Sequence, residues 1–289
     1  MNEERMELRP SGKKNRKMLI FRSLIILCIS LIVIEPLVWM IVSSFKPEPD
    51  IFRYIGLIPR RVTLENYIEG WKGKDLGFAV FFSNSLIIVV FAIIGNLISC
   101  TLTAYAFARM NFRFRSLFFA LMMGTIMLPP HAVIIPQYIF FFKIGINNTF
   151  LPIILPKFFA TDSFFIFLIV QFMRGIPTEL DQAARVDGCN SWDILWRIIL
   201  PLCKPALITT TIFTFLWTWN DFFTQLVYLT DSKLQTVALA LKKFVDADAL
   251  PAYGQMLAMS SLSIIPILIL FAFFQRLLIE GISTTGLKA

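Results

Sequence analysis

Six long apolar runs constrain this chain more than any other feature of its sequence. They cover about residues 18–45, 83–107, 116–142, 150–172, 206–229 and 256–279. A helix needs about 20 mainly apolar residues to cross the hydrocarbon core of a bilayer, and each run reaches that length. The composition agrees, because 57% of the 289 residues are hydrophobic and only 16% are charged, whereas soluble domains carry about 25% charged residues. The sequence therefore predicts an all-α integral membrane protein with six transmembrane helices.

The first apolar run is expected to be a retained span. It is longer than the roughly 7–15 apolar residues at the centre of a signal peptide, and it lacks a cleavage site of small residues. The polar, basic segment 1–17 before it is predicted to be a cytoplasmic tail. Residues 18–289 then form a single transmembrane domain, with a large polar loop at 173–205 and a C-terminal tail at 280–289.

The distribution of lysine and arginine predicts the orientation, because cytoplasmic loops carry an excess of these residues. Two of the loops expected inside contain clusters of them: Arg109, Arg113, Arg115, Arg174, Arg185, Arg197 and Lys204. The outer loop 46–82 is also basic, so the excess is modest. Both termini are predicted to be cytoplasmic (N-in, C-in). Topology accounts for the net charge of +8, so we expect membrane lipid and no nucleic acid as a partner.

Several kinds of chemistry lack the residues that they need. The cysteines at 28, 100, 189 and 203 form no CxxC pair and His131 is the only histidine, so no metal site is predicted. The sequence contains no nucleophile–base constellation, which makes an enzyme embedded in the membrane improbable. It also lacks the GxxxxGK[ST] phosphate loop. We expect no cofactor on this chain, and any nucleotide chemistry must belong to a partner.

The loop 173–205 reads MRGIPTELDQAARVDGCNSWDILWRIILPLCKP. Pro177 suits the first position of a helix and Gly188 suits the position just past a helix end. Asn190 or Ser191 can cap a second short helix that ends before Pro201. The pattern predicts a helix, a glycine turn and a second helix on the cytoplasmic side.

This loop resembles the "EAA" loop of binding-protein-dependent ABC importer permeases, in the spacing EAA-x3-G-x9-I-x-L-P. In that family the loop forms coupling helices that dock into a cleft on a cytoplasmic ATPase. The resemblance implies that the ATPase-coupling residues are Asp181, Gln182, Ala183, Ala184, Asp187, Gly188, Ile198, Leu200 and Pro201. One departure matters, because the family's glutamate is Gln182 here. An ion pair to an ATPase arginine cannot form from this position, and Asp181, about 100° round the helix, is an imperfect substitute.

Other segments resemble the maltose-type sugar permeases, and in particular the smaller of their two permease subunits. They are Ser44-Phe45-Lys46, Ser83-Asn84-Ser85, Ala104 to Arg109, Trp219-Asn220-Asp221 and the ending EGISTTGLKA. The resemblance implies a bacterial plasma (inner) membrane location, a homologous second permease, an external solute-binding protein and two ATPase subunits that hold ATP and Mg. In relatives the C-terminal tail reaches between the ATPases, which implies such a contact for Gly281, Thr284, Gly286 and Lys288.

Polar side chains inside spans are costly and are therefore functional hypotheses. Sugar sites combine hydrogen-bonding groups with aromatic rings, and the fifth span offers both. The residues predicted for the substrate path are Trp217, Asn220, Asp221, Gln225, Asp162 and Glu35. Two alternatives stay open: Asn220 and Asp221 satisfy a kinked backbone instead, and Asp162 pairs with Lys157. The Pro129-Pro130 pair predicts a kink or a break in the third span.

The leading hypothesis is a permease subunit of an ATP-driven sugar importer. The alternatives are a transporter coupled to protons or sodium through Glu35, Asp162 and Asp221, and an ABC permease for a non-sugar or anionic substrate. Ion-coupled folds often contain repeated halves, and no clear internal repeat is visible. Hydrolysis of ATP that depends on substrate would distinguish the first alternative.

Overall fold

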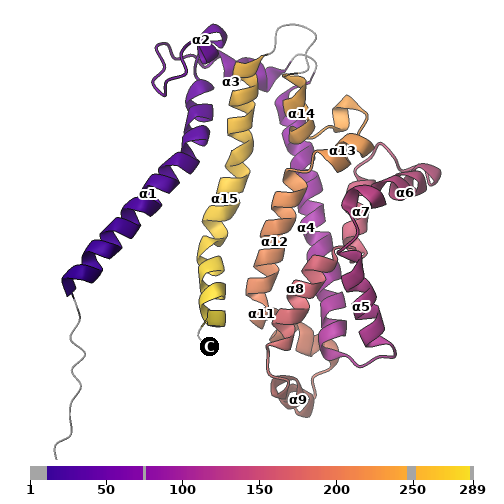
Figure 1. The fold of residues 1–289 in the computed structure, drawn as a ribbon. Helices are drawn as coiled ribbons and strands as arrows, with labels where there is room; N and C mark the ends of the chain where they lie inside the picture. The colour runs from indigo at the N-terminus through magenta and orange to yellow at the C-terminus, as the bar shows by residue number, and fades with distance from the viewer. Residues whose placement is uncertain (1–11, 74–75, 246–251, 287–289) are drawn as a thin grey trace, which may run out of the picture.

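The computed structural model describes residues 12–73, 76–245 and 252–286, and the side chains of 18–73, 76–245 and 252–275. These residues form helices and no strand, which confirms the all-α class. Four long helices run along the molecule: α1 (Gly12–Ser43), α4 (Phe78–Arg109), α12 (Lys204–Trp219) and α15 (Tyr253–Gly286) (Figure 1). Among the described residues, four segments are each long and apolar enough to cross a membrane, or up to six if each bent helix pair is one span.

The third, fourth and fifth predicted spans are each interrupted. Helices α5 (Arg115–Thr125) and α6 (Pro130–Lys143) meet at 101°, which confirms a break at the proline pair. The predicted fifth span, 206–229, is also interrupted, because α12 ends at Trp219 and a short α13 (Phe223–Tyr228) follows. The side-chain amide of Asn220 donates to the Leu216 carbonyl at 2.8 Å. The backbone amide of Asn220 donates to the same carbonyl, so both amide groups of Asn220 are bonded to Leu216 where α12 ends.

The fourth apolar segment is interrupted near its middle. Helix α7 (Leu151–Phe158) and α8 (Ser163–Arg174) are separated by four residues, in which Ala160 has the left-handed φ of 55°. The freed backbone finds a partner on α4, since the Ser99 hydroxyl donates to the Lys157 carbonyl at 2.6 Å. Gly95 leaves the space for this approach, because a Cβ there would lie 2.8 Å from the Phe158 ring.

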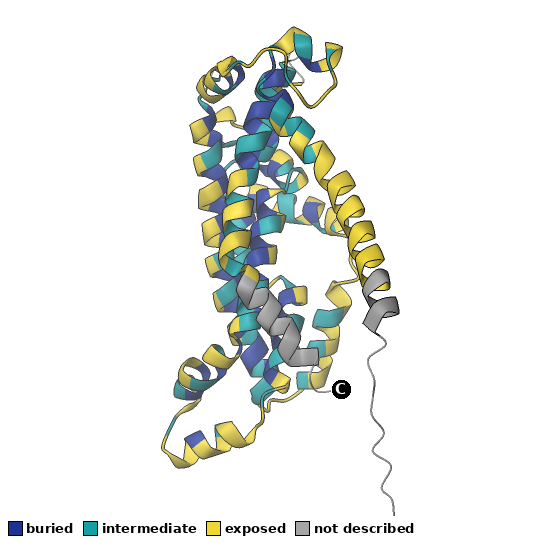
Figure 2. Cartoon of the chain, turned by 90° about the vertical axis from the view of Figure 1, so that its left-hand side faces the viewer, coloured by how far each residue is buried: buried dark blue, intermediate teal, exposed yellow. Residues whose placement is uncertain are grey.

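Helix α4 is the central column of the molecule, in contact with α7, α8 and α12. Its buried face alternates apolar groups such as Ile88 with small residues such as Ala92 and Ala104, so its neighbours approach closely. Helix α1 behaves differently and is exposed along almost its whole length from Met18 (Figure 2). An apolar helix without cover from its own chain needs lipid or another subunit around it.

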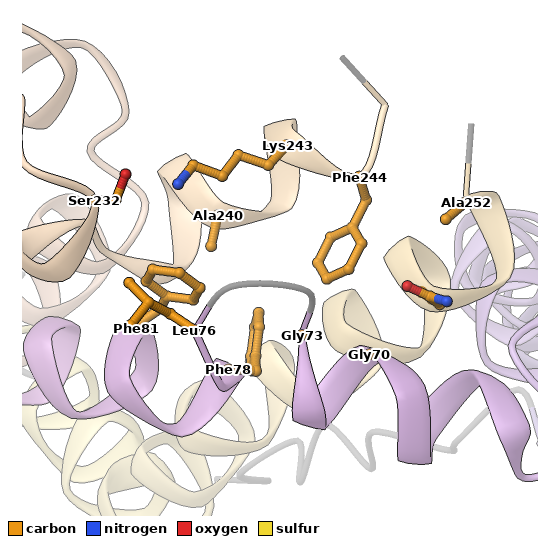
Figure 3. A pocket seen from close by; sticks show the side chains of 11 residues that line it. Gly70, Gly73, Leu76, Phe78, Phe81, Ser232, Ala240, Lys243, Phe244 and Ala252 are labelled. Carbon is orange, nitrogen blue, oxygen red and sulfur yellow. The ribbon is translucent and has the colours of Figure 1, made fainter. Parts of the chain in front are cut away.

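One end of the molecule carries α2 (Glu48–Arg53), α3 (Glu65–Lys72), a 3-10 turn η2 (Ser232–Leu234) and α14 (Val237–Lys243). The Glu48 carboxylate accepts from the backbone amides of Tyr253 and Gly254 at 2.7 Å each, which caps the start of α15. Buried Lys46 donates to the carbonyls of Tyr54 and Gly56. A pocket of about 100 Å³ at this end has walls formed by Phe78, Phe81 and Phe244 (Figure 3).

The opposite end carries the helix–glycine turn–helix that the sequence predicts. Helix α9 (Glu179–Val186) leads into Gly188, whose φ of 85° is left-handed. The second helix follows as α10 (Ser191–Asp193), the π-helical η1 (Ile194–Ile199) and α11 (Leu200–Leu202). Asn190 is its cap: the Asn190 side chain accepts from the amides of Trp192 and Asp193, and the Asp193 carboxylate accepts from the Asn190 amide.

Candidate coupling surface and translocation cavity

The residues of α9 divide between an exposed face and a buried face. Gln182, Ala183 and Asp187 are exposed, whereas Ala184 is buried against the apolar cluster that includes Ile194. A helix places residues at successive positions about 100° apart, so the two alanines of the QAA segment point in different directions. Ala184 therefore packs inside the molecule and the exposed residues remain available to a partner.

The second helix adds a surface that the sequence analysis did not select. Trp192 and Trp196 lie four residues apart on one face and are 59% and 61% exposed. Val186 on α9 is 88% exposed. Ile198 and Leu200 are partly buried, and Pro201 is exposed. Large exposed apolar side chains on a polar loop are typical of a protein interface, and the i, i+4 spacing of the two tryptophans is the signal that could have revealed them.

Asp181 is not available as a substitute for the family's glutamate. Its Oδ2 lies 3.2 Å from Nε of Arg109, and both side chains are largely buried. Arg109 is the last residue of α4, and its Nη2 donates to the Ile176 carbonyl at 2.7 Å. Asp181 thus pairs within the chain.

A cavity of about 580 Å³ lies between the break in the third span and the break in the fifth span. Its walls come from the start of α6, the end of α12 and the start of α13: Pro130, His131, Ile134, Leu216, Trp217, Asn220, Asp221, Phe223 and Thr224. The structure therefore brings together three of the predicted path residues, Trp217, Asn220 and Asp221. Trp217 is held by contacts with the rings of Phe164, Phe165 and Phe213, with centroids 5.1–5.7 Å apart.

The polar groups of this cavity also satisfy the broken backbone, as the alternative predicts. Besides the bond from Asn220 to Leu216, Asp221 Oδ1 accepts from the Thr224 amide at 3.0 Å. Gln225 does not line the cavity. It is buried, its amide donates to the Thr218 carbonyl, and its carbonyl oxygen accepts from the Thr236 hydroxyl. Gln225 is a structural residue that joins α13 to the segment before α14.

The predicted pair of Asp162 and Lys157 is confirmed, with 2.8 Å between Oδ2 and Nζ. The same carboxylate oxygen accepts from the amide of Asn96 on α4 at 2.6 Å, and that amide also donates to the Thr214 hydroxyl on α12. This polar group joins three helices across the break in the fourth segment. Asp162 does not line the cavity. Sequence reasoning missed Asn96, because a lone amide in an apolar run has no local signal for its partners.

Of the remaining predicted residues, Glu35 is the one whose side chain the structure describes. Glu35 is exposed on α1, away from the cavity. Gly281, Thr284 and Gly286 fall within the backbone range of α15, but their side chains, like all of Lys288, lie outside the described residues. Within the described part of the chain, no group of three His, Cys, Asp or Glu side chains could hold a metal ion.

Known proteins resemble the chain over most of its length. It is 33% identical to the "Probable ABC transporter permease protein YurM" of Bacillus subtilis, over 88% of this chain and 83% of the relative. It is 34% identical to the "Arabinooligosaccharides transport system permease protein AraQ" of Halalkalibacterium halodurans, over 90% and 93%. The "Trehalose/maltose transport system permease protein MalG" of Thermococcus litoralis is 30% identical over the same shares.

A solved structure shows the same fold. It is a chain of a bacterial ABC transporter involved in the import of the acidic polysaccharide alginate, with a TM-score of 0.81 and 22% identity over 92% of this chain and 98% of that one. Residues 100–284 match the family described as "Binding-protein-dependent transport system inner membrane component". This match covers more than half of the chain and includes the loop with Gly188 and the cavity, so the chain belongs to this family of ABC importer permeases.

Proposed function

We propose that this chain is one of two permease subunits of an ATP-driven saccharide importer in a bacterial plasma membrane. The observation that carries the proposal is the placement of two features on one helical framework. The cavity lies at the end of α12 that carries Asn220, and the exposed loop surface lies before the other end of the same helix. A partner that moves the loop therefore acts on a helix that lines the cavity.

In this proposal the chain has six spans with both termini in the cytoplasm. The bent pair α5–α6 is the third span, and α12 with the short α13 after it provides the fifth. The loop with α9 then faces the cytoplasm, where one of two separate ATPase subunits docks on Gln182, Val186 and the two exposed tryptophans. The two ATPase subunits bind ATP and Mg. Helix α1, exposed in the isolated chain, faces the homologous second permease or lipid.

The cavity supports a saccharide as substrate. Trp217 is about half exposed and offers an aromatic face to a sugar ring. Asn220, Asp221 and Thr224 offer hydrogen-bonding groups beside it. The volume of about 580 Å³ falls within the roughly 300–1,000 Å³ of ligand sites. The names of similar permeases point to the same class of substrate, because they refer to arabinooligosaccharides, trehalose or maltose, and diacetylchitobiose.

The lining of the cavity favours a neutral sugar over an acidic one. It contains the carboxylate of Asp221 and neither lysine nor arginine. An anionic substrate would meet a like charge in this lining. An external solute-binding protein would deliver the sugar, and a second solved structure supports this arrangement, since it shows the alginate transporter with a periplasmic protein bound to an alginate pentasaccharide.

Ion coupling is less well supported, because two of the three carboxylates predicted for it, Asp162 and Asp221, are already engaged. The Asp162 carboxylate pairs with the ammonium group of Lys157. The ammonium group therefore occupies the place beside the carboxylate that a proton or sodium ion would need. Asp221 Oδ1 accepts from a backbone amide. A reconstituted complex of the two permeases and the ATPases should hydrolyse ATP faster when the sugar-loaded binding protein is added. Sugar uptake driven by an ion gradient without ATP would overturn the proposal.

Thiol labelling tests the cavity itself. In a background without the native cysteines, Asn220→Cys and Asp221→Cys should react with a membrane-impermeant reagent in the ATP-bound state, and sugar should block the reaction. Gln225→Cys is the matched control, since Gln225 is 1% exposed and should stay unlabelled. If positions 220 and 221 resist labelling in every state, they are buried structural groups outside the pathway.

A further inference from the structure

The end of α4 carries two buried polar side chains that face the loop with α9. Tyr105 and Arg109 lie four residues apart, on one face of the helix. Tyr105 is 4% exposed, and its hydroxyl donates to the Ser191 carbonyl at 3.1 Å. The Arg109 side chain is 5% exposed and reaches both the Ile176 carbonyl and Asp181. One helix face thus holds the segment before α9, α9 itself and the start of the second helix.

Arg109 joins α9 and the segment before it to α4 by side-chain contacts. Helix α9 has eight residues, and Ala184 is its buried one. A single small side chain buries little apolar surface, so packing alone would let α9 slide or tilt over the cluster beneath it. The planar guanidinium binds in a fixed direction. Its Nη2 donates to the Ile176 carbonyl, and its Nε forms an ion pair with Asp181 at 3.2 Å without hydrogen-bond geometry. Together these contacts join α9 and the segment before it to α4.

The other end of this connection reaches the cavity. Helix α4 packs on α12, and Asn96 on α4 bonds to Thr214 on α12. Five residues after Thr214, α12 ends at Trp219, and the break that follows lines the cavity. A displacement of α9 that is fixed to α4 is therefore carried to α12 through packed helices and a side-chain hydrogen bond.

We propose that Arg109 is the positioning residue that makes α9 and α4 move as one body, with Asp181 as its internal counterion. The proposal rests on the function proposed above, in which an ATPase docks on α9. Asp181 then contributes to coupling by holding Arg109, and the ATPase contact of α9 is made by its exposed residues. Two steps are then distinct. The ATPase binds the exposed residues of α9, and Arg109 transfers the resulting motion of α9 to the spans.

The test uses the complete reconstituted complex with its ATPases, partner permease, binding protein and sugar. Arg109→Gln should assemble and keep the basal ATPase rate, because the docking surface is unchanged. The ATP hydrolysed per sugar transported should rise about fivefold or more, which is the lower end of typical coupling between sites. Arg109→Lys should fall between wild type and Arg109→Gln, because an ammonium keeps the charge opposite Asp181 and lacks the planar fork.

Two further variants separate coupling from folding. Adding Asp181→Asn to Arg109→Gln should not raise the ATP hydrolysed per sugar any further, because it removes the carboxylate that Arg109→Gln leaves without a counterion. Arg113→Gln is the control, because Arg113 is an exposed arginine near the same end and should leave the ratio unchanged. If wild type shows no sugar-stimulated hydrolysis, the proposed function fails, whatever the variants do. If wild type is coupled and Arg109→Gln keeps its ratio, the role of Arg109 is overturned. If Arg109→Gln does not assemble, wild-type ratios in both Arg109→Lys and Asp181→Asn overturn it instead.

Discussion

Replacing Gly188 with valine should uncouple ATP hydrolysis from transport. Gly188 has a φ of 85°, and a Cβ placed on it would meet no atom within 4 Å. The cost of a side chain is therefore conformational and not steric. A left-handed conformation costs an L-residue about 1–2 kcal/mol, and a β-branched side chain suits it least. This cost lowers the population of the native turn about 5- to 30-fold.

The turn matters because it sets the angle between α9 and the second helix. In the native turn the Cys189 amide donates to the Ala184 carbonyl, and the Gly188 amide donates to the Arg185 carbonyl. A chain that leaves this turn loses both bonds, and α9 no longer presents its exposed face in register with Trp192. Transport by Gly188→Val should fall with the population of the turn, while the basal ATPase rate persists.

The assay compares sugar uptake and ATP hydrolysis in proteoliposomes at equal amounts of assembled complex. Gly188→Asn should retain most of the transport, because asparagine tolerates the left-handed region. Gly145→Val is a matched control, since Gly145 also has a left-handed φ of 75° and open space around it, but lies in the turn after α6. It should lower stability without changing the ATP used per sugar. Full transport by Gly188→Val, or an equal loss in Gly188→Asn, would refute the reasoning.

Three further changes test the loop and the broken fourth segment. Gln182→Glu should be tolerated and should tighten the ATPase contact through a charge-assisted hydrogen bond, and co-purification of the ATPase measures this; loss of assembly would mean that this ATPase requires a neutral side chain. Lys157→Met should lower the thermal stability of the detergent-solubilised protein by about 1–3 kcal/mol, less than for a fully buried pair, and Asp162→Asn added to it should recover part of the loss; a further drop would contradict the pairing. Gly95→Ala should also destabilise by about 1–3 kcal/mol through overpacking, because its Cβ would lie 2.8 Å from Phe158, and unchanged unfolding would show that the ring moves aside.

Local features of the fold could be predicted from the sequence because their physics is local. The length of the apolar runs sets the helical spans, and Pro129-Pro130 breaks the third one whatever surrounds it. The left-handed turn at Gly188 and the cap at Asn190 depend on residues within a few positions of each other. The loop spacing that includes Gly188 also identified the family, which the match over residues 100–284 shows.

The tertiary structure decided how the polar side chains are used, because their partners lie far away in the sequence. Asp181 resembles an ATPase contact until Arg109 is found opposite it, 72 residues earlier (181 − 109). Asn96 carries no local signal, and its role follows from its bonds to Asp162 and Thr214.

The sequence left open whether Asn220 and Asp221 satisfy a kinked backbone, and the tertiary structure shows that they do so while they also line the cavity. The cavity exists because the break at Asn220 packs against the start of α6, about 90 residues away in sequence (220 − 130). The length of each apolar run shows which residues belong to a membrane-spanning helix. The partner of each polar group, and the space enclosed between two broken helices, depend on long-range packing that no local pattern encodes.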